Sequence, residues 1–217
     1  MVDTTTQIGA VTRTLRLTEV DGQPARAQSL TQTYPSPVDD VWEALTTSER
    51  IARWFLPIAG DLRPGGRYQL EGNAGGEVLE CEPPSDGAAR YRVTWEMMGA
   101  VSWLEVSLTA DGDRTRVRME HLARVGDVPD GMWETYGPGA TGVGWDGGLL
   151  GLSLHLGAVD GSLAPQEAQA WAATDEGHAF YRAAADAWGR AHEASGVDRA
   201  TAQAAADETY RFYTGTA

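Results

Sequence analysis

The segment from residue 66 to residue 121 restricts the possible folds most, because apolar and polar side chains alternate along it between short, glycine-containing turns. Such alternation is the pattern of a β-strand with one buried and one solvated face. Tyr91, Val93 and Trp95, for example, share one face of a predicted strand. Short turns connect antiparallel neighbours, so the segment predicts an antiparallel sheet that is covered on one side.

Further strands and two short helices are predicted before this segment. Residues 11–34 alternate around one turn, which favours two early strands. Ser36 then offers a helix N-cap, with Pro37 at the first helical position. The helix carries an apolar stripe formed by Val38, Val41, Trp42 and Leu45. A second brief helix is expected from Ser48 to about Trp54.

A glycine-rich helix is predicted after the sheet. Its apolar stripe consists of Trp145, Leu149, Leu152 and Leu156, and several glycines lie in or beside that stripe. An interior glycine costs a helix about 0.5–1 kcal/mol relative to alanine, so tertiary packing must hold this helix in place. We expect the missing side chains either to let the helix approach the sheet closely or to leave room for a bound molecule.

The alanine-rich residues 162–213 differ from the rest of the chain and predict further helices. Gly196 ends one helix, and Asp198 caps a last one. We therefore divide the chain into a domain at 1–160 and a helical extension at 161–217. The extension is expected either to cover a cavity or to form a dimer surface.

The charge balance excludes several classes of protein. The net charge is −14, and the 17 basic residues are all arginine, with no lysine in the chain. An acidic chain disfavours sequence-independent binding of nucleic acid, which depends on a basic surface. Schiff-base, pyridoxal phosphate and P-loop chemistry each need a lysine amine, so the absence of lysine excludes all three.

Targeting signals and disulfides are not expected either. No stretch approaches the roughly 18 apolar residues of a membrane span, and the first residues lack the pattern of a signal peptide. Cys81 is the single cysteine and cannot form an intramolecular disulfide. We expect a cytoplasmic protein without a nucleic-acid or membrane partner.

Two other motifs point to no cofactor. Residues 142–147 spell G-x-G-x-x-G, with Asp160 downstream, but no strand precedes them and the dinucleotide-binding context is missing. His178 and His192 share a helix face about 21 Å apart and therefore cannot bind one ion. The chain has no C-x-x-C or H-E-x-x-H motif. We predict neither a metal site nor a cofactor.

A series of ordered motifs resembles the bacterial homologues of the activator of heat-shock protein 90 ATPase, within the START-like (SRPBCC) superfamily. The motifs lie at 36–46, 53–55, 61–68, 77–84, 93–96, 115–121 and 144–149. The resemblance covers roughly residues 12–157 and implies an α+β helix-grip fold. In this fold a curved antiparallel sheet wraps around a long C-terminal helix, with a cavity between them. The helical extension departs from the family pattern.

The resemblance implies that a small hydrophobic or aromatic molecule binds in this cavity, and we expect binding rather than catalysis. A closed cavity of about 300 Å³ or more would favour this role. The alternatives are a co-chaperone-like interaction module, with a chaperone partner and a stress-response role by family analogy, and a cyclase- or aromatase-like enzyme. A homodimer also stays open. The expected ligand-binding residues are Trp54, Phe55, Tyr68, Trp95, Met119, His121, Trp145, Leu149 and Leu152.

His121 is the one candidate catalytic residue. It shares a strand face with Val117 and Met119, and in the family fold that face looks into the cavity. There the imidazole would hydrogen-bond a ligand or act as a general base. The alternative is a histidine that is simply paired with backbone or water at a strand end.

Overall fold

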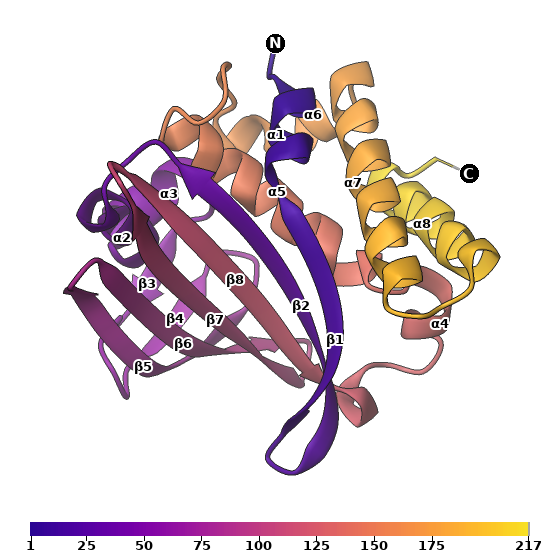
Figure 1. Ribbon diagram of the computed structural model, residues 1–217, viewed down its shortest axis with the longest axis horizontal. Helices are drawn as coiled ribbons and strands as arrows, with labels where there is room; N and C mark the ends of the chain where they lie inside the picture. The colour runs from indigo at the N-terminus through magenta and orange to yellow at the C-terminus, as the bar shows by residue number, and fades with distance from the viewer. Residues whose placement is uncertain (217) are drawn as a thin grey trace.

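Eight strands form one antiparallel sheet in the computed structural model, which describes residues 1–216 (Figure 1). Their order in the sheet is β1-β2-β8-β7-β6-β5-β4-β3. The strands are β1 (Thr12–Val20), β2 (Gln23–Tyr34), β3 (Ile58–Gly60), β4 (Arg67–Leu70), β5 (Gly75–Ser85), β6 (Ala88–Met97), β7 (Ala100–Asp111) and β8 (Arg114–Arg124). Every neighbouring pair of strands is antiparallel, and the sheet is strongly curved (Figure 1), which confirms the predicted architecture.

The helices gather against the sheet and beyond one of its edges (Figure 1). They are α1 (Thr4–Ala10), α2 (Val38–Thr46), α3 (Ser48–Trp54), α4 (Met132–Tyr136), α5 (Gly139–His155), α6 (Ala168–Ala172), α7 (Asp175–Ala194) and α8 (Arg199–Thr214), with 3-10 turns η1 (Val125–Asp127) and η2 (Pro165–Glu167). Helix α5 is the predicted glycine-rich helix and packs between α3 on one side and α7 and α8 on the other. The fold is the α+β helix-grip fold that the sequence predicts.

One hydrophobic core connects the sheet with α2, α5 and the C-terminal helices. Leu30 and Val106 come from the sheet, Val143 and Leu152 from α5, and Trp188 from α7. Trp188 is 1% exposed, so a residue beyond position 161 lies as deep as any strand residue. The division of the chain at residue 160 stays a prediction, although the two parts share this core.

Close approach of α5 to the sheet, one of the two roles expected for its glycines, is not what the two most tightly packed glycines provide. A Cβ atom on Gly142 would lie 2.3 Å from the Trp188 ring, and one on Gly151 would lie 2.2 Å from the Trp54 carbonyl oxygen. Close approach therefore occurs toward neighbouring helices, not toward the sheet. Residues 142–147, which spell the nucleotide-binding pattern, lie wholly within α5.

Three local features differ from the sequence prediction. Helix α1 was not expected, because threonine and glycine are weak helix formers, but the Asp3 carboxylate caps it by accepting from the Thr6 amide. Strand β5 continues through Pro83 and Pro84, where its pairing with β6 is irregular, since proline cannot donate to the ladder. Pro37 holds the N-cap position of α2 in place of Ser36.

Candidate functional site

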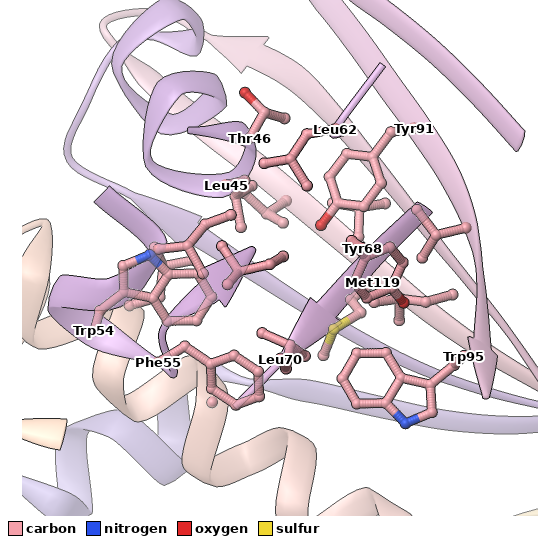
Figure 2. A pocket seen from close by; sticks show the side chains of 18 of the residues that line it. Leu45, Thr46, Trp54, Phe55, Leu62, Tyr68, Leu70, Tyr91, Trp95 and Met119 are labelled. Atoms are coloured by element: carbon pink, nitrogen blue, oxygen red, sulfur yellow. The ribbon is translucent and has the colours of Figure 1, made fainter. Parts of the chain in front are cut away.

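An apolar cavity of about 130 Å³ lies between the sheet, α2, α3 and α5 (Figure 2). Its lining includes no charged side chain. The residues that line it are Leu45, Thr46, Ile51, Trp54, Phe55, Ile58, Leu62, Tyr68, Leu70, Val78, Cys81, Tyr91, Val93, Trp95, Leu104, Val106, Val117, Met119, Trp145, Gly148, Leu149 and Leu152.

Two pairs of aromatic rings form walls of the cavity. Trp54 ends α3, and its ring stacks on that of Phe55, with 5.5 Å between the ring centroids. The Trp54 indole donates to the Ala44 carbonyl of α2 at 2.9 Å, which fixes the orientation of that wall. Trp95 and Trp145 meet edge to face at 4.7 Å between centroids. These walls are held before any ligand arrives, which lowers the cost of ordering a site on binding.

Three hydroxyl groups lie in the lining, and two of them have protein partners. Thr46 Oγ1 donates to the Trp42 carbonyl, and Tyr68 Oη donates to the Thr94 carbonyl, each at 2.7 Å. Tyr91 Oη makes no hydrogen bond with any residue in the range 1–216. Burial raises the pKa of Tyr91, so its hydroxyl stays protonated and able to donate.

Cys81 lies beside Tyr91 in the lining, because the two residues are register partners on β5 and β6. Its thiol is half-buried, and burial raises the pKa of this group. The thiol therefore stays protonated at neutral pH, which makes it a slow nucleophile. Its position nevertheless makes it a chemical reporter of the cavity interior.

Eight of the nine predicted ligand-binding residues line the cavity, namely Trp54, Phe55, Tyr68, Trp95, Met119, Trp145, Leu149 and Leu152. They come from α3, the segment after it, β4, β6, β8 and α5, and the fold brings them together. Their contact with a ligand stays a prediction.

His121 lies next to the cavity and outside its lining. Its Nε2 is 2.9 Å from the Ser102 Oγ, and its ring packs edge-on against Trp145 at 5.5 Å between centroids. Burial lowers the pKa of His121 to about 4, so the imidazole is neutral at physiological pH. The imidazole is thus paired with a serine side chain and not with backbone or water, and its role toward a ligand stays a prediction.

The prediction missed lining residues that strand alternation already indicates. Tyr91 and Val93 share a face with Trp95, and Val117 shares one with Met119. Leu45 belongs to the predicted apolar stripe of α2, whereas Ile58 of β3 carries no comparable signal. Whether these two residues face the cavity depends on how α2 and α3 fold over the sheet. Both are only half-buried.

The described residues, 1–216, include no group of three metal-ligating side chains close enough to hold an ion. In the same range, none of the helices combines the length and the apolar character that crossing a bilayer requires.

A family model described as "Activator of Hsp90 ATPase homolog 1-like protein" matches residues 35–152. The chain belongs to this family, as its ordered sequence motifs predict.

Among solved structures, the chain is similar to CalU16 from Micromonospora echinospora. The CalU16 crystal structure shares 36% identity, over 68% of this chain and 86% of that one, with a TM-score of 0.57. The solution NMR structure of CalU16 shares 28% identity, over 95% and 94% of the two chains, with a TM-score of 0.60. The second alignment covers nearly the whole chain, so CalU16 also has a counterpart of most of the helical extension.

Protein MLL2253 from Mesorhizobium loti is 21% identical over 62% of this chain and 99% of that one, with a TM-score of 0.52, and supports the fold alone. A comparison with curated proteins finds no match.

Proposed function

We propose that the protein binds a small apolar molecule in the cavity between α5 and the sheet. The observation that carries this proposal is a preformed cavity whose walls are aromatic and aliphatic and contain no charge. Tightly packed interiors leave few voids larger than a water molecule, so an apolar void of this size is typical of a site that binds an apolar molecule. Membership of the family is compatible with such a role.

The size of the cavity limits the ligand. Its volume of about 130 Å³ is below the roughly 300 Å³ at which small-molecule sites usually begin. It is close to that of an engineered apolar cavity of about 150 Å³ that binds benzene. A single aromatic ring with small substituents therefore fits the observed shape, and a larger ligand requires α2 and α3 to move outward.

The two alternatives receive less support from the geometry. A cyclase-like reaction needs a proton acceptor facing the ligand, and His121 lies outside the lining. A co-chaperone-like role is supported only by the name of the family, and binding of a chaperone partner is inferred only by analogy with that family. Binding without turnover is therefore the function that the site supports best.

Filling the cavity tests the proposal. In Val93→Phe a ring would enter the space of the ligand, whereas Val101→Phe makes the same change at a position on β7 that is 38% exposed. We expect toluene to raise the melting temperature of the wild type and of Val101→Phe, and calorimetry to detect its binding. Val93→Phe should fold, as judged by circular dichroism, and lose this response.

Absence of any thermal shift or heat of binding with toluene and indole in the wild type would overturn the proposal. Equal responses in the two phenylalanine variants would place the ligand outside this cavity.

A further inference from the structure

Building on the proposed function, we infer that the cavity selects neutral aromatic molecules with one hydrogen-bonding substituent, which the Tyr91 hydroxyl holds. Phenols and aryl ketones are members of this class.

The Tyr91 hydroxyl differs from the other two hydroxyl groups of the lining in having no protein partner among the described residues. The other two hydroxyls of the lining are bonded to backbone carbonyls, as described above. Tyr91 Oη has no partner within residues 1–216, although Figure 2 shows the ring directed into the pocket with its oxygen at the inner end. The oxygen is not among the fully buried polar atoms without a partner, so it is open to the space of the cavity. A ligand that fills this space displaces any water from the hydroxyl, and a polar substituent on the ligand replaces the lost hydrogen bond.

The Tyr91 ring is held in a fixed position, so its hydroxyl is oriented before binding. Tyr91 pairs in register with Cys81 on β5 and with Val106 on β7, at the centre of the sheet. Its ring also meets the edge of Trp42 from α2 at 6.1 Å between centroids. A donor fixed in this way selects the position of a polar substituent on the ligand, because little rotamer entropy is lost on binding.

The uncharged lining of the cavity disfavours an ionic ligand. The cavity contains no arginine, histidine, aspartate or glutamate. A carboxylate or an ammonium group would leave water without gaining an opposite charge, and the desolvation cost of an unpaired ion is far greater than that of a neutral group. The neutral form of an aromatic ligand is therefore favoured over either ion.

A comparison of p-cresol with toluene tests the inference, because the two differ by one hydroxyl. The readout is the ratio of their dissociation constants in each variant, which removes the different hydrophobicity of the two ligands. In Tyr91→Phe we expect the relative affinity for p-cresol to fall about five- to tenfold. Tyr210→Phe is the matched control, because it removes a tyrosine hydroxyl on α8, outside the lining of the cavity, and it should keep the wild-type ratio.

The thiol of Cys81 supplies a second measurement that needs no variant. A ligand ring that is hydrogen-bonded to the Tyr91 hydroxyl would lie beside Cys81. Saturating p-cresol should therefore slow the reaction of this single cysteine with a thiol reagent. The charged analogues 4-methylbenzoate and 4-methylbenzylamine should bind more weakly than p-cresol.

The outcomes separate the two proposals. If neither toluene nor p-cresol binds the wild type, the proposed function itself fails. If both bind but Tyr91→Phe leaves the ratio unchanged, or a charged analogue binds more tightly than p-cresol, the cavity binds apolar molecules and the inference about Tyr91 is wrong. Unchanged Cys81 reactivity under saturating p-cresol would likewise place the phenol away from Tyr91.

Discussion

The two sides of α5 differ in how they are packed. Toward α7, Gly142 packs against the Trp188 ring, and the Asp146 carboxylate accepts a hydrogen bond from the Trp188 indole at 2.9 Å. The same carboxylate accepts a hydrogen bond from Arg13 of β1 at 2.7 Å. Asp146 is 1% exposed. Toward the sheet and α3, Trp145 and Leu149 face an empty volume of about 130 Å³.

The difference shows that one helix can contribute to the stability of the fold on one side and border a cavity on the other. Dense packing and paired polar groups stabilise a fold, whereas a void costs dispersion contacts and is retained where something must enter. Of the glycines in α5, Gly142 allows the close packing against α7, and Gly151 allows a close approach to the Trp54 carbonyl of α3. We infer that the C-terminal helices hold α5 in position, so that its opposite side can remain underpacked.

Loss of the buried carboxylate should have the largest effect. Asp146→Ala leaves the Arg13 guanidinium, whose side chain is 5% exposed, without its ionic partner. We expect the free energy of unfolding to fall by about 3–5 kcal/mol, as for other buried pairs that lose one partner. Denaturant titration measures this change.

Asp207→Ala is the matched control, because it removes a half-exposed carboxylate that pairs with Arg182. Exposed pairs contribute about 0–1 kcal/mol. A comparable loss of stability in the two variants would contradict the proposed contrast between the sides of α5.

The pH dependence of His121 tests the region beside the cavity. Its pKa is about 4 in the folded protein, below the ordinary value of 6.5, so the unfolded chain binds the proton more readily. The stability that this histidine contributes is complete above pH 6.5 and declines as the pH falls toward 4. From pH 7 to pH 4 the wild type should lose about 2–3 kcal/mol more than His121→Gln, as measured by denaturant titration at each pH. Parallel stability curves would show that His121 is solvated.

Adding one methyl group to α5 should have the smallest effect, with opposite signs at two positions. A Cβ on Gly142 meets the buried Trp188 ring, so Gly142→Ala should destabilise the protein by about 1–3 kcal/mol. A Cβ on Gly147 meets nothing within 4 Å, so Gly147→Ala should stabilise it by about 0.5–1 kcal/mol. Thermal unfolding separates the two. Destabilisation in both variants would mean that α5 needs glycine for reasons other than packing.

The sequence predicts the sheet well, because the side-chain alternation in β6, β7 and β8 directly encodes which face is buried. Helix α5 was also predicted from its apolar stripe. The partner of its glycines was not, since the pattern of a single helix shows which positions lack side chains and not which neighbour fills the space. Trp188 fills it from α7, 46 residues after Gly142.

The aromatic part of the site could be predicted from the sequence, but its polar recognition could not. Tyr68 and Tyr91 both belong to alternating strands and look equivalent in the sequence. They differ because the Tyr68 hydroxyl reaches the Thr94 carbonyl, while that of Tyr91 reaches no acceptor in the structure. Such a difference depends on distances between strands that no local pattern contains.

The position of Asp146 also has a consequence for how the protein is made. Its contact with Arg13 joins residues 133 positions apart, and its contact with Trp188 adds a group 42 positions later in the chain. Contacts between distant positions form slowly, because a long loop must close before they contribute. The carboxylate is therefore fully paired only after Trp188 has been synthesised, which ties completion of this side of α5 to the appearance of α7.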